Sequence, residues 1–207
     1  MAITEVLPGF TTQQTTVQTS ERWKKIEPLV REDLQKDGIE LLPRNLAEIF
    51  AKVHTGESIN GKGVCFYGGT GTGKTRRLRW MSNAFDIPFI NAVVLCEYLM
   101  QAETQEEKNE ILRCSISRWS EIPKHFNDPI IDDLGTEPEE QKTYGTKRYL
   151  MADALERRYE LFPKWKTHIT TNLSLNELKN RYGERVFSRL NEMCCFIALT
   201  GKDRRIK

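Results

Sequence analysis

The chain has 207 residues, of which 39% are hydrophobic and 29% are charged. This length allows one compact domain with a sizeable core and a short appendage, and it leaves little room for two full domains. Lys and Arg number 31 against 29 Asp and Glu, so the net charge of +2 indicates neither a nucleic-acid nor a membrane partner. Any site for a polyanion must therefore be local.

Nothing in the sequence indicates export or membrane insertion. No apolar run reaches the roughly 18 to 20 residues of a membrane span, and the N-terminal MAITEVLPGF lacks a basic segment followed by an apolar one. We expect a cytoplasmic protein with no membrane partner. Its cysteines show no metal-ligand spacing, and we expect reduced thiols at Cys65, Cys96, Cys114, Cys194 and Cys195.

The N-terminal part is predicted to be separate from the core. Residues 1–20 are polar and too poor in apolar side chains to offset the entropy of ordering, so we expect a disordered tail. Residues 21–45 show helical periodicity, which Pro28 is expected to break into two pieces before Gly38 ends it. We expect this short helical segment to bind a partner and residues 46–207 to form the core.

The core alternates short apolar runs with helical patterns. After a helical stripe over 46–53, the β-rich runs cover 64–67, 88–95, 129–131, 168–171 and 194–199, and the main helical patterns cover 97–119 and 149–162. This alternation predicts an α/β fold with a five-stranded parallel sheet and helices on both faces.

A phosphate-binding loop follows the first apolar run. The sequence GGTGTGKT matches G-x-x-x-x-G-K-[ST] and precedes a helical segment, as this motif requires. Its glycines let backbone N–H groups surround phosphates at a helix N-terminus, while the lysine reaches the terminal phosphates and the threonine hydroxyl is a ligand for Mg²⁺. The predicted nucleotide-binding residues are Gly68, Gly69, Thr70, Gly71, Thr72, Gly73, Lys74 and Thr75.

Two further strand ends carry polar side chains. PIIDDLG ends in Asp132 and Asp133, which we assign to the Mg²⁺ shell and to polarising the attacking water, respectively. ITTN ends in Asn172, which is suited to holding that water and sensing the γ-phosphate. Ser174 then begins a capping box, and a helix that stops near Gly183 is followed by a second one.

The second of these helices carries two arginines. In RYGERVFSRL, Arg185 and Arg189 lie four residues apart and therefore on one helical face. A GTPase is the less favoured interpretation because no N-K-x-D follows the loop. A small-molecule kinase is disfavoured because no Arg-rich lid is evident over 97–128.

The combination of motifs resembles one family. GGTGTGKT, IIDDLGTE, RRYE, ITTNLSLNEL, RYGERVFSRL and LTGKDRR together are similar to the DnaC/IstB group of AAA+ ATPases, over about residues 46–205. The resemblance implies a P-loop NTPase fold of the AAA+/ASCE type without a C-terminal helical lid, and the cofactors ATP and Mg²⁺. It also implies Walker A at Lys74 and Thr75, Walker B at Asp132 and Asp133, a sensor at Asn172, and an arginine finger at Arg189 assisted by Arg185.

The function implied by this resemblance is that of a helicase loader. Such a protein would hydrolyse ATP between the subunits of a homo-oligomer while loading or remodelling a replicative helicase on single-stranded DNA. An IstB-like transposition helper is the alternative, followed by a P-loop phosphotransferase or a nucleotide-gated adaptor that does not hydrolyse ATP.

Two basic clusters leave their role open. Arg76, Arg77 and Arg79 follow the phosphate loop, and Lys202, Arg204, Arg205 and Lys207 close the chain. Each cluster fits contacts to a nucleic-acid backbone or a merely solvated surface. The four tryptophans next to basic residues are interpreted as core or interface aromatics rather than base-stacking platforms.

Overall fold

The structure is a computed structural model, and it describes residues 22–36, 38–39, 44–54, 62–85, 87–112, 128–143, 146–161, 166–201 and 203. The expected disordered tail at 1–20, the predicted helical stretch 113–119, Cys114 and the C-terminal basic cluster lie outside these residues.

A five-stranded parallel sheet forms the centre of the chain. Its strand order is β2–β3–β6–β1–β7, and every pairing within it is parallel. The strands are β1 (Gly63–Tyr67), β2 (Phe89–Asn91), β3 (Ile130–Leu134), β6 (His168–Thr171) and β7 (Cys194–Ala198). The predicted fold class is therefore confirmed. The second strand is shorter than predicted, because Asn91 caps a helix that starts at Ala92.

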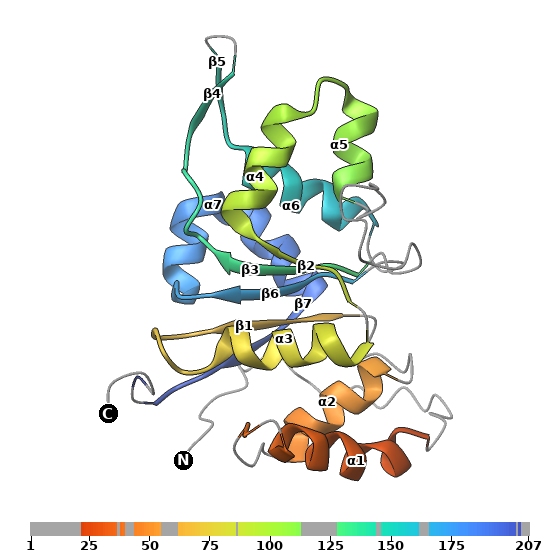
Figure 1. Cartoon of the computed structure of the whole chain (residues 1–207). Helices are drawn as coiled ribbons and strands as arrows, with labels where there is room; N and C mark the ends of the chain where they lie inside the picture. Colours follow the sequence, from red (N-terminus) through yellow and green to blue (C-terminus); the bar gives the residue numbers. More distant parts are fainter. Residues whose placement is uncertain are drawn as a thin grey trace.

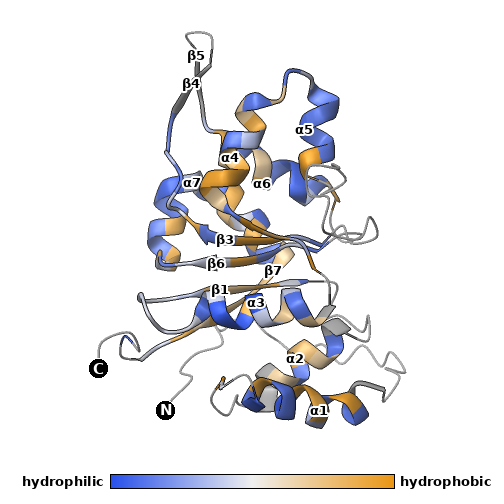
Figure 2. Cartoon of the chain, viewed as in Figure 1, coloured by the Kyte–Doolittle hydropathy of each residue, from blue (hydrophilic) through white to orange (hydrophobic). Residues whose placement is uncertain are grey.

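Two hydrophobic clusters cover the two faces of the sheet. Along β1, Val64 and Phe66 belong to the cluster formed with α1 (Arg22–Lys36), α2 (Arg44–His54) and α3 (Lys74–Phe85), whereas Cys65 belongs to the other. That second cluster contains residues of α4 (Ala92–Gln101), α5 (Gln105–Leu112), α6 (Leu150–Leu161) and α7 (Leu175–Met193). Alternate side chains of a strand point to opposite faces, so a buried strand supplies both clusters. Figure 2 shows the hydrophobic colour along the strands and on α4.

The N-terminal helices pack against the rest of the molecule beside α3 (Figure 1). The ring of Phe50 in α2 lies 6.2 Å from that of Phe66 and 5.7 Å from that of Trp80, which joins the helix to β1 and α3. Trp80 is 8% exposed, which confirms it as a core aromatic.

The predicted break at Pro28 is wrong, since α1 continues through it as one helix. Pro28 is exposed and lies in the second turn, where its ring costs the helix one backbone hydrogen bond without disturbing the buried side of α1.

The helices on the other face begin and end differently from the prediction. The pattern over 97–119 corresponds to α4 and α5, which are separated at 102–104, where Thr104 accepts a hydrogen bond from the Glu107 N–H. The predicted helix over 149–162 is α6, with Leu150, Met151, Ala154 and Leu155 buried as expected.

The last helix has the predicted interruption. Ser174 and Glu177 form the expected capping box at the start of α7, and Gly183 has φ 83°, so the helical path kinks there. Glycine adopts this left-handed conformation without the steric penalty of a side chain.

The sequence did not predict the antiparallel hairpin of β4 (Gln141–Thr143) and β5 (Thr146–Arg148), which projects from the body in Figure 1. Among the described residues, no helix combines the length and the apolar composition of a membrane span.

The described cysteines are buried free thiols, at Cys65, Cys96, Cys194 and Cys195. Burial raises the pKa of Cys96 and of Cys194 to about 12, so both thiols are protonated at neutral pH. This agrees with the expectation of reduced thiols for these four residues, which pack as small hydrophobic side chains.

Candidate nucleotide-binding site

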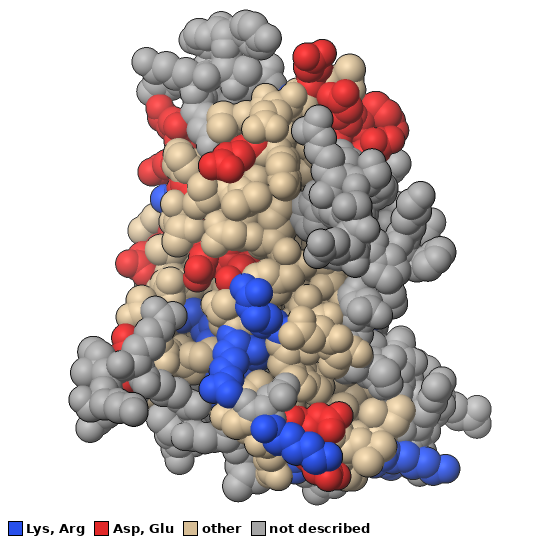
Figure 3. Space-filling view, viewed as in Figure 1, with Lys and Arg blue, Asp and Glu red and all other residues tan. Residues whose placement is uncertain are grey.

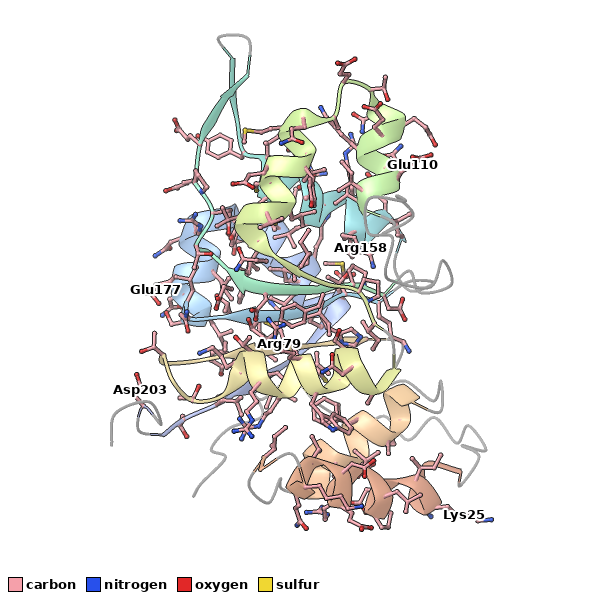
Figure 4. The ribbon with its side chains drawn as sticks, viewed as in Figure 1. Lys25, Arg79, Glu110, Arg158, Glu177 and Asp203 are labelled. Carbon is pink, nitrogen blue, oxygen red and sulfur yellow. The ribbon has the colours of Figure 1, made fainter. Side chains whose placement is uncertain are left out.

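The loop 68–73 connects β1, which lies between β6 and β7 in the sheet, to the N-terminus of α3. Its backbone needs glycine where φ is positive, and Gly71 (φ 71°) has a second constraint. A Cβ atom on Gly71 would lie 1.8 Å from Oδ1 of Asp203, so the carboxylate of Asp203 lies directly against the loop (Figure 4). The Thr72 hydroxyl donates to the carbonyl of Gly69 (3.0 Å), which closes the loop on itself.

Two buried cations brace the loop from inside. The Lys74 ammonium donates to the carbonyls of Gly68 (2.7 Å) and Gly69 (2.6 Å), and only 4% of this residue is exposed. The Arg77 guanidinium donates to the carbonyls of Thr72 (3.0 Å) and Gly73 (3.1 Å) and is 7% exposed. Arg77 is therefore part of the loop's support and not of a solvated surface.

A cavity of about 530 Å³ opens beside this loop. This volume falls in the range of small-molecule and cofactor sites, about 300 to 1,000 Å³. The described residues that line it come from four separate stretches of the chain: Gly38 and Ile39 after α1, residues of 70–79, Asp133 near the end of β3, and Asn172 after β6.

The cavity is rich in positive charge. Among the described lining residues, four are cationic, Lys74, Arg76, Arg77 and Arg79, and one, Asp133, carries a carboxylate. Figure 3 shows Lys and Arg side chains gathered over α3 on this face. Arg79 is exposed, and its guanidinium lies 4.4 Å from the centre of the Phe89 ring. The arrangement suits an anionic ligand whose charged part lies against the loop.

The two acids in β3 have different environments. Asp133 lines the cavity and has φ 55°, in the left-handed region. Asp132 is 4% exposed and is not among the described lining residues. Its Oδ1 atom accepts a hydrogen bond from the Thr170 hydroxyl (2.6 Å), and the same hydroxyl oxygen accepts the N–H of Asp133 (2.8 Å).

Asn172 lies where β6 ends, on the strand between β1 and β3. It is exposed and lines the cavity together with Lys74, Thr75 and Asp133. The sequence-predicted loop, acid and amide residues are thus brought to one edge of the sheet. The oxygen atoms of Thr75 and Asp132 are donors of the type that Mg²⁺ prefers, so the donor set at this edge fits the metal that the loop motif implies.

Arg185 and Arg189 lie elsewhere. Both bind the carboxylate of Glu156 in α6, each with an N···O distance of 3.1 Å, and the Arg189 guanidinium also lies 4.9 Å from the centre of the Tyr159 ring. They share one helical face as predicted, but neither is among the described residues that line the cavity.

A buried carboxylate that the sequence did not single out joins the loop after β3 to α7. Glu137, 2% exposed, accepts hydrogen bonds from the Gly135 N–H (2.8 Å) and from the Tyr182 hydroxyl, and it pairs with Arg181. Burial raises the pKa of Tyr182, and the carboxylate of Glu137 raises it further.

Sequence reasoning also missed Thr170, Asp203 and the wall formed by Gly38 and Ile39. Thr170 could have been suspected, because a polar side chain two residues before Asn172 in a strand points to the same side. The other contacts join residues far apart in the chain, and no local pattern indicates them.

Comparisons with known proteins give likenesses of structure alone. No protein-family model matches the chain, and no curated protein matches it either. Among solved structures, it is similar to AMPPCP-bound DnaA from Aquifex aeolicus, with a TM-score of 0.49 and 17% identity over 78% of this chain. It is also similar to the structure of Drosophila ORC bound to GC-rich DNA and Cdc6, with a TM-score of 0.44 and 10% identity over 94% of this chain. A third similar structure is NtrX from Brucella abortus in complex with ADP, with a TM-score of 0.38 and 12% identity over 84% of this chain.

The chain spans 48%, 63% and 41% of the lengths of those three chains, respectively. In its own geometry, a phosphate-binding loop follows β1 of a five-stranded parallel sheet and leads into α3. Two acids lie in the last part of β3, and β6 separates β3 from β1. The described chain therefore has an α/β fold of the P-loop NTPase type, with helices on both faces of the sheet.

Proposed function

We propose that this protein is a Mg²⁺-dependent AAA+ ATPase of the helicase-loader type. The observation that carries the proposal is the shared cavity, which a P-loop lysine, an acid in β3 and an amide after β6 line together. These three groups suit binding of a triphosphate, polarisation of a water and positioning of that water.

The residues divide the work as follows. Lys74 and the loop N–H groups bind the β- and γ-phosphates, and Arg77 holds the loop in shape through the carbonyls of Thr72 and Gly73. Thr75 and Asp132 would hold Mg²⁺, which supplies neutralisation of phosphate charge when bound. Asp133 accepts a proton from the attacking water, and Asn172 orients that water.

The finer part of the proposal concerns partners. Arg189, assisted by Arg185, would complete the ATP site of a neighbouring subunit in a homo-oligomer, in exchange for its contact with Glu156. The partners would be a replicative helicase and single-stranded DNA. The exposed arginines Arg76 and Arg79 at the cavity mouth support an anionic partner near the nucleotide.

Mixed oligomers test the shared site. Lys74→Ala retains Arg189 but lacks its own phosphate contact, whereas Arg189→Ala retains the phosphate loop. Each variant alone is expected to lose steady-state ATP hydrolysis, and an equimolar mixture is expected to regain part of it. Arg157→Ala, on the neighbouring helix α6, is the matched control and retains activity. A mixture as inactive as its components would contradict action between subunits.

Partner assays separate the alternatives. Stimulation of ATP hydrolysis by single-stranded DNA and by a replicative helicase supports the loader, and stimulation by duplex DNA and a transposase supports the transposition helper. Phosphate transfer to a small acceptor would indicate a phosphotransferase. Nucleotide binding without hydrolysis under every one of these conditions would indicate an adaptor.

The N-terminal helices need a test in the full chain, because their buried faces belong to the core. Leu29 on α1 is 58% exposed, so Leu29→Asp alters the outer surface and leaves the packing of Val30 and Leu34 in place. If residues 21–45 bind the helicase, this variant is expected to lose helicase binding and keep ATP binding. Met100→Asp, on exposed α4 surface, is the control.

A further inference from the structure

The pairing between β3 and β6 is irregular at the two acids. Ile131 pairs with Ile169 and Leu134 pairs with Thr171, so β3 advances three residues while β6 advances two. One extra residue is therefore accommodated at Asp132 and Asp133. Asp133 has φ 55°, and it is the one non-glycine residue with positive φ in the described part of the chain. A non-glycine residue in this region is strained and persists where the surroundings hold it.

A single hydroxyl occupies this irregularity. Thr170 is fully buried (0% exposed), and its Oγ1 atom lies 2.6 Å from Oδ1 of Asp132 and 2.8 Å from the backbone nitrogen of Asp133. The hydroxyl donates its proton to the carboxylate and accepts the N–H. It therefore fixes the side chain of one acid and the backbone of the other at the same time.

We propose that Thr170 is a positioning residue that sets the geometry of the acid pair, and through Asp132 the affinity of the site for Mg²⁺. The inference rests on the proposed function, since it assigns Asp132 to the metal. Thr170 is 0% exposed, so it acts through Asp132 and not by contact with the nucleotide. Outer-shell partners of metal ligands commonly affect metal affinity or activity by about 10- to 100-fold.

The chain contains a matched control one residue away. Thr171 is also fully buried in β6, and its hydroxyl donates to the carbonyl of Leu134 (2.7 Å) and accepts the Leu173 N–H (3.1 Å). It makes the same kind of hydrogen bonds, but to backbone groups and to neither carboxylate. Loss of the Thr171 hydroxyl therefore reports the cost of disturbing the strand pair alone.

The experiment measures nucleotide binding as a function of Mg²⁺. Binding of a nonhydrolysable ATP analogue is followed by calorimetry, first in EDTA and then across a Mg²⁺ series, for the full chain and for Thr170→Val, Thr170→Ser and Thr171→Val. Thr170→Val is expected to bind the analogue in EDTA within about twofold of wild type, and to need about 10- to 100-fold more Mg²⁺ for half-maximal strengthening. Thr170→Ser keeps the hydroxyl and is expected to stay within about threefold of wild type. If Thr170→Val does not fold, Thr170→Ala replaces it.

The outcomes are distinct. A wild-type Mg²⁺ requirement in the folded variant that lacks the hydroxyl would overturn the proposal. A Mg²⁺ requirement in Thr170→Ser as high as that of Thr170→Val would overturn it too. If Thr171→Val raises the Mg²⁺ requirement as much as Thr170→Val does, the effect is a general disturbance of the strands, and the proposal is also overturned. If the unmodified protein binds no nucleotide at all, the proposed function fails. If it binds nucleotide with no effect of Mg²⁺, only the metal role, and with it this inference, is lost.

Discussion

The two edges of the sheet both bury charged side chains, and at the carboxyl edge these side chains line a cavity. At the carboxyl edge, Lys74 is 4% exposed and faces a space of about 530 Å³. At the amino edge, Arg158 is fully buried, and its guanidinium donates to the Thr167 hydroxyl (2.9 Å) and to the carbonyls of Leu112 (2.9 Å) and Lys166 (2.5 Å). Figure 4 shows Arg158 within the body of the molecule, on α6.

The difference teaches how to interpret a buried charge in this protein. The donors of Arg158 are directed at groups of the fold itself, which ties the end of α5 and the start of β6 to α6. The lysine of the phosphate loop contacts carbonyls of a loop that lines a cavity, where an anion can compete for it. A buried cation therefore indicates a contribution to stability at the amino edge and a binding site at the carboxyl edge. Substitutions should separate these two roles, because one measurement is the free energy of unfolding and the other is nucleotide affinity.

The largest expected effect is at Arg158. Arg158→Met would leave three buried acceptors without donors and should lower the free energy of unfolding by about 3 to 4 kcal/mol, measured by urea denaturation. Nucleotide affinity of the folded fraction should not change. Arg157→Met, next to it in α6, removes a hydrogen bond to Asn109 and is expected to cost less than about 1 kcal/mol. Equal losses in the two variants would remove the distinction drawn for Arg158.

Lys74→Ala should show the opposite pattern. We expect ATP affinity to fall by at least about 100-fold in calorimetry, because the triphosphate loses a charged donor in a buried setting. The free energy of unfolding without nucleotide should change by less than about 1 kcal/mol. Wild-type affinity in this variant would refute the assignment of the loop as the phosphate site.

His168 at the amino edge offers a pH test. Burial, and then the charges of Lys166 and Arg158, lower the pKa of this imidazole to about 3 from an ordinary 6.5. In the unfolded chain this imidazole is protonated as the pH falls below about 6.5, whereas in the folded chain it stays neutral down to about pH 3. The free energy of unfolding therefore decreases as the pH falls from 6.5 to 3, and it is fully regained above pH 6.5.

Between pH 6.5 and 5 this difference amounts to about 2 kcal/mol. His168→Asn keeps an acceptor for the Val64 N–H, which the imidazole Nδ1 accepts at 3.2 Å, but it does not titrate. Urea denaturation at pH 7 and pH 5 should show a smaller loss of stability in the variant than in wild type. An unchanged pH dependence would show that His168 is not held neutral by the fold.

The smallest effect is expected at Tyr182, whose contact with Glu137 lies at the carboxyl edge but is closed to the cavity. Tyr182→Phe removes one donor from a buried carboxylate and should lower the free energy of unfolding by about 1 kcal/mol, with ATP affinity unchanged. Tyr149→Phe removes an exposed hydroxyl contact to Glu140 and is the control, with no measurable change. Reduced ATP affinity in Tyr182→Phe alone would extend the site to this carboxylate.

The sequence predicted most of the sheet, because buried parallel strands read as apolar runs that helical patterns separate. The sequence-based prediction was wrong at two places where the local pattern had two interpretations. The apolar residues 92–95 fit a strand as well as a helix, and Asn91 decided the matter by capping α4 with a hydrogen bond to the Val93 N–H (2.9 Å). Pro28 was expected to break α1, but tertiary packing of Val30 and Leu34 holds the helix together across it.

The candidate site was predictable as far as its parts are local motifs. The loop with Lys74 and Thr75 follows β1, the acids Asp132 and Asp133 lie in the last part of β3, and Asn172 follows β6. Parallel strands end at one edge of the sheet, so these groups come together there. The hydrogen bond of Thr170 to Asp132, the closeness of Asp203 to Gly71 and the place of Ile39 in the cavity wall were not predictable. They join residues that strand order and helix packing bring together.

The sequence by itself therefore determined the phosphate-binding motif, the α/β alternation and the chemical types of the groups that meet a nucleotide, because these depend on residue identity and short spacing. The tertiary structure alone decided which buried charges face a cavity and which close the fold. Lys74 and Arg158 are both long cations within helices, and no local pattern separates them. Their surroundings separate them. Arg158 donates to backbone and hydroxyl acceptors of the fold at the amino edge, whereas Lys74 contacts the carbonyls of a loop that borders a cavity at the carboxyl edge.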